Sequence, residues 1–480
     1  MSALTSRGLA ILLGEWRADA TAAVPRPLYE VLADRIRLLV LDGRIALGVR
    51  LPAERALAAH EGLSRTTVAG AYARLRDLGY LRSVRGSGSV VQLPPGDAPP
   101  MIGAPGTGLL DFSSASLPAV PLIAEAAREA AELLPRHLEA PGFDLLGLPE
   151  LRAAIAERCT RAGVRTEPDE IMVTLGAQHA LALVARTLVA RGDRVLIESP
   201  TYPHAIEALR GAGGRLVTVP VTTDEGWDDD ALARAFARSS PALAYLMPDF
   251  HNPTTRVMPD EQRARVAALA EAHGTVLVVD ETMADLGFEG STATPMAAFG
   301  PGVVTLGSVG KSIWGGIRLG WIRADRALIT RLAVARSAGD LGSPTLEQLV
   351  LLRLLDRYDR VLDARRAQLV AGHALMAREL ARRFPSWSVP EVGGGLTFWV
   401  GIGAPVASRL ALAARAEGVL IGAGPRFGID GAFERFVRIP FCRPEEESLR
   451  ALDALQRAWT GLGEQPAPPA AGGELLETVV

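Results

Sequence analysis

The stretch TLGSVGKSIWGGIRLGW, residues 305–321, contains Lys311, which is the only lysine of the chain. The other 50 of the 51 basic residues are arginines. Only a primary amine can condense with an aldehyde, because a guanidinium stays protonated and is a poor nucleophile. A lysine kept where arginine cannot replace it indicates a Schiff-base lysine, and the alternative is a surface lysine that has survived by chance.

The neighbours of Lys311 favour the first interpretation. They comprise small residues and one arginine, namely Gly307, Ser308, Gly310, Gly315, Gly316 and Arg318. Glycines let the backbone approach a bulky cofactor, and the fork of an arginine guanidinium suits a phosphate. The stretch therefore predicts that Lys311 carries pyridoxal 5'-phosphate.

Size and composition limit the classes of protein to which the chain can belong. A length of 480 residues predicts two or three domains. The two cysteines, Cys159 and Cys442, provide neither a disulfide framework nor a metal-binding set, so we expect no metal and a reducing compartment. Apolar runs of signal-peptide or transmembrane length are absent from the sequence, and we expect a cytoplasmic protein without a membrane partner.

Charge is distributed unevenly along the chain. The net charge is -3, but residues 24–92 hold 11 arginines and 6 acidic residues and so carry +5. A basic small module joined to an acidic large one suggests a nucleic-acid partner for the first part. A solvated charged surface would explain the charge equally well by itself.

The amino-terminal module has the pattern of a winged helix-turn-helix. Apolar residues at helical spacing in residues 28–47 predict a helix that stops at Gly43. Two more helices follow, separated by a tight turn at Gly62–Leu63, with Ser64 as the N-cap of the second. The first turn of that helix would face base edges. The next segment alternates and turns at residues 86–88, as a two-stranded wing would.

From residue 28 to residue 91, LYEVLADRIR…LDGRI…LPAERALAAHEGLSRTTVAGAYARLRDLGYL…RGSGSVV resembles the DNA-binding domain of GntR-type regulators. The resemblance implies an operator in double-stranded DNA as partner and a location at the nucleoid. It implies DNA contacts from Arg55, Ser64, Arg65, Thr66, Thr67, Arg85, Gly86, Ser87 and Gly88. Plain helix surface is the alternative for the two threonines. Ala53 stands where the family usually has a serine, so a phosphate contact would be lost there.

Composition also predicts the domain boundaries. Residues 92–109 are rich in proline and glycine and read as an extended linker, so the two domains need not hold a fixed angle. We assign residues 24–91 to the DNA-binding domain, 110–462 to the large domain and 463–480 to a disordered tail.

Repeated strand–helix units in the large domain predict an α/β fold. We expect a parallel-rich sheet with helices on both faces, ligands at the carboxyl ends of its strands, and a smaller C-terminal α+β subdomain. A strand passes into a helix at Gly176, Ala177 and Gln178. Backbone N–H groups and the helix dipole meet there, which predicts a phosphate seat.

Four polar side chains complete the candidate site. Asp280 ends an apolar strand, and its carboxylate needs a partner such as a protonated pyridine nitrogen. Tyr202 can stack on a flat heterocycle, and core packing is its alternative. Asn252 can donate to a phenolic oxygen. Arg438 lies on an apolar strand and would bind a substrate carboxylate, with a structural ion pair as the alternative.

These segments occur in the order of fold-type I aminotransferases, which residues 110–460 resemble. The resemblance implies Lys311 as internal aldimine, Asp280 at the pyridine nitrogen and Asn252 at the phenolic oxygen. It also implies Tyr202 stacked on the ring and Arg438 as a carboxylate clamp. The implied phosphate contacts are Gly176, Ala177, Gln178, Ser308 and Arg318. Joined to a GntR-type head, the chain is similar to MocR-type regulators, and a homodimer is implied.

The sequence departs from the aminotransferase pattern in three respects. A tyrosine usually follows the aspartate and meets the phenolic oxygen, but the chain has Thr282 and Met283 there. Gly310 precedes the lysine where serine is common. Phe143 lies where a tyrosine from the neighbouring subunit often reaches the phosphate. The departures weaken the case for efficient transamination without forbidding the lysine linkage.

Three functional hypotheses follow. The first is a transcriptional regulator whose aminotransferase-like domain senses pyridoxal phosphate, or an amino acid or amine that attacks the Lys311 linkage. The second is a working aminotransferase with a residual DNA-binding head. The third is a scaffold that binds no cofactor. Ligand-dependent DNA binding, steady turnover and a colourless protein would distinguish them.

Overall fold

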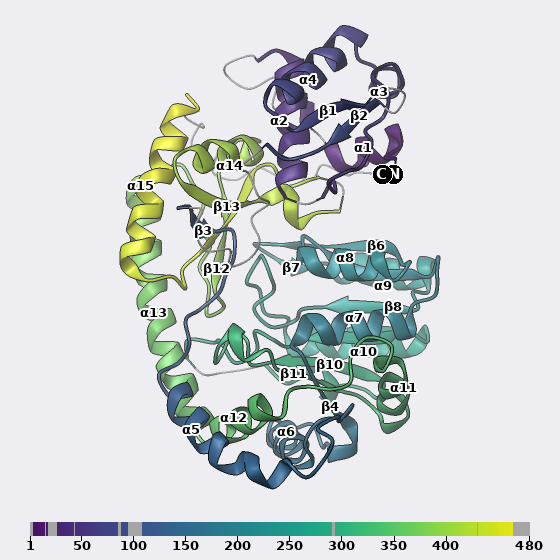
Figure 1. The fold of residues 1–480 in the computed structure, drawn as a ribbon, viewed down its shortest axis with the longest axis vertical. Coiled ribbons are helices and arrows are strands. Elements are labelled where there is room, and N and C mark those ends of the chain that lie inside the picture. The colour runs from purple at the N-terminus through teal and green to yellow at the C-terminus, as the bar shows by residue number, and fades with distance from the viewer. Residues whose placement is uncertain are drawn as a thin grey trace.

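The structure is a computed structural model that describes residues 3–14, 16–17, 26–42, 44–84, 88–94, 108–289, 293–429 and 431–463. Arg85, Gly86 and Ser87, most of the predicted linker and all but the first residue of the predicted tail lie outside the described residues. Figure 1 shows a small head above a small domain, with a large domain below both. No described helix is long and apolar enough to cross a lipid bilayer.

The head is a winged helix-turn-helix, as predicted. Its elements are α1 (Ser6–Leu13), α2 (Leu28–Leu41), α3 (Glu54–Glu61), α4 (Arg65–Asp77), β1 (Leu81–Val84) and β2 (Gly88–Val91). The predicted first helix ends at Leu41, because Asp42 caps it there, and Gly43 lies outside the described residues. Helix α1 was not predicted, and its Leu9 and Leu13 are buried in the core of the head.

The large domain is built on an eight-stranded sheet. Its strands are β4 (Ile171–Thr174), β5 (Arg194–Ser199), β6 (Arg215–Thr222), β7 (Gly226–Trp227), β8 (Leu243–Leu246), β9 (Val276–Asp280), β10 (Val303–Ser308) and β11 (Gly320–Arg323). The order is β4-β11-β10-β9-β8-β5-β6-β7. The sheet is parallel-rich, as predicted, and its strands β11 and β7 run antiparallel to their neighbours. Residues 309–319 join β10 to β11 and are too few for a crossover helix.

Helices cover both faces of this sheet (Figure 1). They are α5 (Ile123–Leu133), α6 (Pro149–Arg161), α7 (Ala177–Leu188), α8 (Pro203–Gly211), α9 (Asp229–Ser239), α10 (Asp260–Ala272), α11 (Arg326–Arg336) and α12 (Thr345–Leu355). Strand side chains alternate between two cores, as a strand of period two requires. Val278 packs with α7, α8 and α11, whereas Leu277 and Val279 pack with α9 and α10.

The small domain contains a four-stranded sheet of order β12-β14-β13-β3. Its elements are β3 (Leu110–Phe112), α13 (Tyr358–Arg383), β12 (Thr397–Gly401), α14 (Ala407–Ala416), β13 (Val419–Ala423), β14 (Phe436–Pro440) and α15 (Glu445–Gly461). The sequence predicted a C-terminal α+β subdomain, and the structure confirms it. The edge strand β3 was missed, because its three residues come from the start of the large domain and pair in parallel with β13.

The head packs on the small domain of the same chain. Figure 1 shows α2 facing α14, and α4 farther from the small domain. Leu38 of α2 is buried in the core of the small domain, and Leu412 of α14 packs against the core of the head. The structure thus shows one docked arrangement, and the expectation of a variable angle between the domains stays a prediction.

Candidate cofactor site and DNA-binding face

Lys311 lies in the short connection between β10 and β11, at the carboxyl end of β10. Its Nζ atom donates a hydrogen bond to the Ala115 carbonyl at 2.6 Å. Burial lowers the pKa of this amine, the positive charge of Arg438 lowers it further, and buried Cys442 opposes the shift. A lowered pKa leaves more of the amine neutral and therefore nucleophilic, which is the state that condensation with a carbonyl needs.

Asp280 ends β9 at the same edge of the sheet. Its carboxylate accepts hydrogen bonds from the Tyr245 hydroxyl at 2.8 Å and from the Thr282 N–H at 3.0 Å. Tyr245 lies on the neighbouring strand β8, and its buried hydroxyl has a raised pKa because of burial and the charge of Asp280. We did not predict Tyr245. The available signal was a lone tyrosine in the apolar run ALAYLM.

The predicted phosphate seat lies at the start of α7. Gly176 precedes the helix with φ +95°, a conformation that glycine adopts readily. Arg318 reaches it from beyond β10, because a Cβ added to Gly176 would lie 3.5 Å from the Arg318 Nη2 atom. Arg318 itself has φ +55°, in the left-handed region that non-glycine residues seldom occupy. Strained backbone of this kind often marks a ligand site, so the structure brings Gly176 and Arg318 together as a candidate anion seat.

The other predicted phosphate contacts flank this seat. Ala177 is the first residue of α7. Gln178 donates through Nε2 to the His204 carbonyl at 3.2 Å, while its Oε1 atom is buried without a partner. The Ser308 hydroxyl donates to the Leu319 carbonyl at 3.2 Å and accepts from the Gly310 N–H at 3.1 Å. Gly310, where a serine is common, therefore contributes a backbone donor to the hydroxyl of Ser308.

Arg438 on β14 contacts Asn252 at the boundary between the large domain and the small domain, which together we call the body. Its Nη1 atom donates to the Asn252 Oδ1 atom at 3.0 Å, and its Nη2 atom donates to the Ser113 carbonyl. The side chain is 7 % exposed, lies 4.9 Å above the Phe427 ring and forms no ion pair with a carboxylate of the described residues. Burial and the charge of Arg426 lower the Arg438 pKa to about 10. The structural ion pair that was the alternative for this arginine is therefore absent from the described chain.

Tyr202 caps the start of α8 beside this pair, and its ring centroid lies 5.2 Å from that of His204. Burial and the charge of Asp280 raise the pKa of the Tyr202 hydroxyl to about 12. Because the Oδ1 atom of Asn252 accepts from Arg438, the Nδ2 group of Asn252 is the one that can donate to a phenolic oxygen.

The positions that depart from the family pattern occupy different surroundings. The Thr282 hydroxyl is buried without a partner, close to Asp280. Met283 packs against the core of the small domain and supplies no donor. The Phe143 side chain is 72 % exposed. A hydroxyl donor in place of the usual tyrosine could therefore come only from Thr282 among these three.

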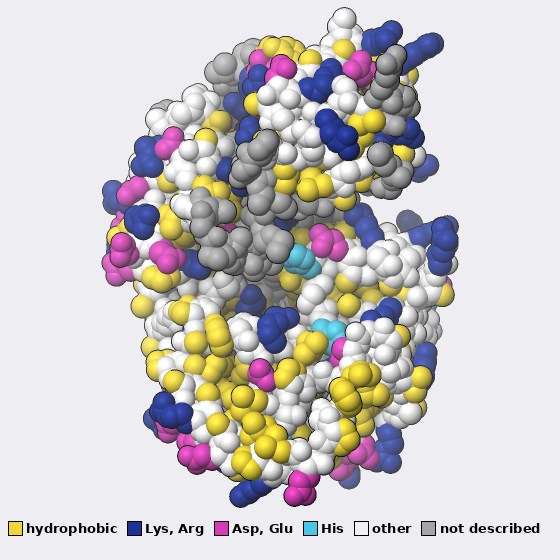
Figure 2. All heavy atoms as spheres, in the orientation of Figure 1, with side chains coloured by type: hydrophobic (Ala, Val, Ile, Leu, Met, Phe, Trp, Pro, Cys, Tyr) yellow, Lys and Arg dark blue, Asp and Glu magenta, His cyan; other side chains and the backbone are white. Residues whose placement is uncertain are grey.

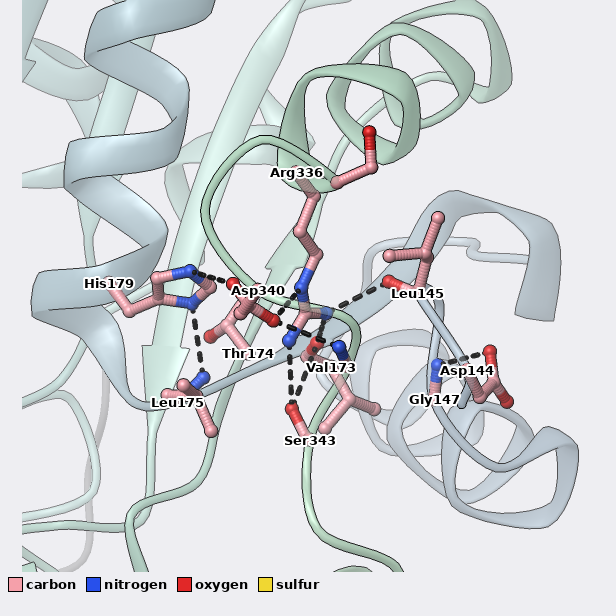
Figure 3. A network of polar contacts seen from close by, with 12 residues as sticks. Asp144, Leu145, Gly147, Val173, Thr174, Leu175, His179, Arg336, Asp340 and Ser343 are labelled. Atoms are coloured by element: carbon pink, nitrogen blue, oxygen red, sulfur yellow. Dashed lines mark hydrogen bonds and ion pairs between the residues drawn. The ribbon is translucent and has the colours of Figure 1, made fainter. Parts of the chain in front are cut away.

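A buried polar network fixes the strand that leads into the phosphate seat (Figure 3). Arg336, at the end of α11, donates to the carbonyls of Leu145 and Val173 and to the Asp340 carboxylate. Asp340 in turn lies 2.9 Å from the Nε2 atom of His179 on α7. The network thus ties β4 and α7, which flank Gly176, to α11 and the loop that follows it.

A cavity of about 350 Å³ is lined by Cys159, Glu281, Asp285, Trp321 and Arg366 among others, and it reaches Ser308 at the end of β10. The Oε1 atom of Glu281 is buried without a partner. Burial and the nearby charge of Asp249 raise the pKa of the Glu281 carboxyl to about 8. Folded chains therefore hold this proton at a pH where unfolded chains have released it.

Glu281 should make stability fall as the pH rises. Its folded pKa lies above its usual value of 4.5, so the stabilisation is complete below about pH 4.5 and lost as the pH rises through about 8. In that window wild type should lose up to about 1.4 kcal/mol per pH unit more than Glu281→Gln, which stays neutral. Urea unfolding at a series of pH values measures both. Parallel curves for the two proteins would contradict the assignment.

The candidate DNA-binding face lies at the start of α4. The Ser64 hydroxyl accepts from the Thr67 N–H at 3.0 Å, which confirms the predicted N-cap. The side chains of Arg55, Arg65 and Thr66 are exposed, and Gly88 opens the second strand of the wing. Basic side chains are spread over the face of the head that Figure 2 shows, with a few acidic ones among them, and basic groups favour an approach to phosphates.

Ser64 allows capping and DNA contact to be separated. Ser64→Ala should lower the stability of the head by about 1 kcal/mol, because the Thr67 N–H loses its acceptor. Ser64→Asp should keep the cap and the stability, yet weaken DNA binding, because its charge repels the phosphates. Thermal unfolding and DNA titration measure the two effects. Undiminished DNA affinity in Ser64→Asp would place this helix start away from DNA.

Comparisons with known proteins agree with both parts of the structure. Residues 106–455 match the family of class I and II aminotransferases, and residues 28–91 match the gntR family of bacterial regulatory proteins. The chain is 33% identical to the 2-aminoadipate transaminase of Thermus thermophilus, and the match covers 74% of this chain and 91% of that transaminase. It is 32% identical to the probable rhizopine catabolism regulatory protein MocR of Rhizobium meliloti, over 63% of the chain and 66% of that protein.

A solved structure gives the same result for the body. The α-aminoadipate aminotransferase LysN of Thermus thermophilus, complexed with N-(5'-phosphopyridoxyl)-L-leucine, superimposes with a TM-score of 0.68 at 29% identity. The match covers 74% of this chain and 93% of that one. Family and neighbours together imply pyridoxal phosphate as the cofactor. The chain belongs to the class I and II aminotransferase family, in the MocR-type arrangement in which such a domain follows a GntR-type DNA-binding head.

Proposed function

We propose that the chain is a DNA-binding transcriptional regulator whose aminotransferase-like domain binds pyridoxal phosphate through Lys311. It senses the cofactor itself, or an amino acid or amine that reacts at the cofactor. The head supplies the exposed start of α4 to an operator. The large and small domains supply a site where Lys311 lies close enough to Asp280 and Arg438 for their charges to act on its amine.

The main support for the proposal is the buried guanidinium of Arg438, which has no carboxylate partner among the described residues. A buried guanidinium without a carboxylate is costly, and no described carboxylate pairs with it. A ligand carboxylate would provide the missing charge and could accept two hydrogen bonds from the fork. The neighbouring charge of Arg426 increases the gain from binding an anion. The pocket therefore suits a ligand that carries both an amine and a carboxylate.

The residues around Lys311 fit pyridoxal phosphate. Bound at this site, the cofactor supplies an aldehyde for amines and an electron-withdrawing ring. Lys311 would condense with the aldehyde through Nζ, with loss of one water, and Asp280 would hold the proton of the ring nitrogen by ion pairing. Gly176 and Arg318 would orient the phosphate end of the cofactor.

A working aminotransferase with a residual head is the second candidate. The favouring observation is that this chain keeps the lysine, the aspartate and the carboxylate-binding arginine together, and that one relative is a 2-aminoadipate transaminase. Thr282 and Met283 in place of a tyrosine argue against efficient turnover. Steady exchange of amino groups between L-2-aminoadipate and 2-oxoglutarate at enzyme-like rates would favour the second candidate over the first.

The proposed working unit is a homodimer. Figure 2 shows apolar side chains gathered on the lower half of the face in view. Large apolar residues that are exposed in the body include Leu138, Phe143, Trp314 and Leu341. Exposed apolar surface of this kind is typical of a contact between subunits, and a two-fold pair of heads would suit paired half-sites. Sedimentation of the full chain as a monomer at micromolar concentration would contradict the dimer.

Titration of operator-containing DNA with the full chain tests the regulator directly. The DNA affinity is measured without ligand, with pyridoxal phosphate, and then with L-2-aminoadipate and each proteinogenic amino acid in turn. We expect a change of at least about fivefold for one of them, the lower end of common coupling strengths. The absorbance of the bound cofactor is followed in the same samples. A DNA affinity that ignores every ligand would reject the regulator.

A further inference from the structure

The docked head is held by a buried arginine. Arg35 of α2 is 1 % exposed and donates through Nη1 to the Glu434 carboxylate and the Ser408 hydroxyl. Its Nη2 atom donates to the Gly431 carbonyl at 3.1 Å. Glu434 is buried too and accepts from the Ser408 N–H at 2.9 Å. Removing one partner of such a pair leaves an uncompensated buried charge, so these contacts specify where the head sits.

A second set of contacts places the head on the same stretch of the small domain. Arg44, which follows α2, donates to the Pro425 carbonyl at 2.8 Å. Gly431 has φ +84°, and a Cβ there would lie 2.7 Å from the Arg35 Nη2 atom, so only glycine permits this approach. The head thus rests on residues 422–429 and 431–438, which we call the coupling segment.

The coupling segment also contributes Arg438 and Phe427 to the candidate ligand site. It contains Arg438, and it contains Phe427, whose ring lies 4.9 Å below that guanidinium. The Phe427 carbonyl accepts from the Thr201 N–H at 2.9 Å, next to Tyr202. Gly422 pairs with Arg438 across the two strands β13 and β14. Residues that contact the head and residues of the candidate ligand site therefore lie on one short piece of chain.

We propose that the coupling segment transmits ligand binding at Arg438 to the position of the DNA-binding head. This inference rests on the proposed function and adds the route of its regulation. A ligand carboxylate would compete with Asn252 and the Ser113 carbonyl for the Arg438 fork and would alter the stacking on Phe427. The Pro425, Gly431 and Glu434 contacts lie on the same segment, so the docked position of the head changes with the pocket.

The start of α4 stays accessible in the docked head. Figure 1 shows α4 on the part of the head away from α14, so the docked head leaves the start of α4 accessible to DNA. Docking therefore orients the recognition helix and leaves it uncovered. Linkage requires the converse effect, in which DNA bound to the docked head changes ligand affinity by the same factor.

Glu434→Gln in the full chain tests the route, because it keeps the shape of the side chain and removes its charge. In the absence of ligand we expect faster hydrogen exchange of the α2 amides. With ligand, we expect the change in cofactor absorbance to persist while the DNA affinity no longer responds, so that the ratio of dissociation constants moves to about one. Glu417→Gln is the matched control, since Glu417 forms an exposed pair with Arg457 in the same domain.

Arg35→Gln provides a second variant from the opposite side of the pair and should behave in the same way. The inference is overturned if α2 exchanges as in wild type in both variants. It is also overturned if both variants keep the full response of DNA affinity to L-2-aminoadipate or to whichever proteinogenic amino acid acts on wild type. A wild type whose DNA affinity ignores every ligand overturns the proposed function as well, whereas the exchange result tests docking alone.

Discussion

Lys311→Ala should abolish the covalent attachment of pyridoxal phosphate. Lys311 is the sole lysine, so the variant has no ε-amine left to condense with the aldehyde. After borohydride reduction, mass spectrometry should find a pyridoxyl adduct on Lys311 in wild type and none on any side chain of the variant. The absorbance band of the lysine-linked cofactor should be replaced by that of the free aldehyde. This is an all-or-none effect, and we expect it to be the largest of any single substitution on the site.

Lys311→Arg separates the amine from its charge. Arginine keeps a cation at this position but cannot condense, so it should lose the adduct as completely as alanine does. Both variants should stay folded, because among the described residues Lys311 donates one hydrogen bond, to the Ala115 carbonyl. An adduct on Lys311→Arg chains, or the absence of an adduct from wild type, would contradict the proposed attachment of the cofactor at Lys311.

Arg336→Met should destabilise the large domain by about 3 kcal/mol. The Arg336 side chain is fully buried. Its loss would leave the Leu145 carbonyl without a donor among the described residues, and would leave the Val173 carbonyl with Ser343 alone and the Asp340 carboxylate with Gly342 and His179. Unpaired buried acceptors carry the full cost of their desolvation. Urea unfolding followed by circular dichroism measures the change in the free energy of unfolding.

Arg331→Met is the matched control on the same helix. The Arg331 side chain is exposed, and a surface substitution of this kind usually changes stability by no more than about 0.5 kcal/mol. Equal stability of the two variants would show that the network in Figure 3 contributes little. Because β4 leads into Gly176, we also expect Arg336→Met to bind pyridoxal phosphate more weakly than Arg331→Met does.

Much of the fold could be predicted from local patterns in the sequence. The winged helix-turn-helix was predictable because capping residues, turn glycines and helical spacing are local features, and Ser64 caps α4 as expected. The helix-covered sheet followed from repeated apolar strands, and the structure confirms that Asp280 ends β9 and Arg438 lies on β14. The roles of these residues stay predictions.

Features that depend on distant parts of the chain were not predictable. Tyr245 reaches Asp280 only because β8 and β9 are neighbours in the sheet, which one sequence does not specify. The pair formed by Arg438 and Asn252 joins two domains. In the sequence, Arg35 could not be distinguished from other charged helix residues, because its partner Glu434 lies about 400 positions away. Long-range partners of this kind require the tertiary structure.

The edge strand β3 has a consequence for how the protein is made. The large-domain sheet is complete once the ribosome has released β11, so that domain can fold while synthesis continues. The small-domain sheet instead joins β3 to β13 and β14, which emerge more than 300 residues later. Residues 110–112 therefore have no strand partner until β13 has been made, and the head, although translated first, can dock only after residues 422–438 have been made.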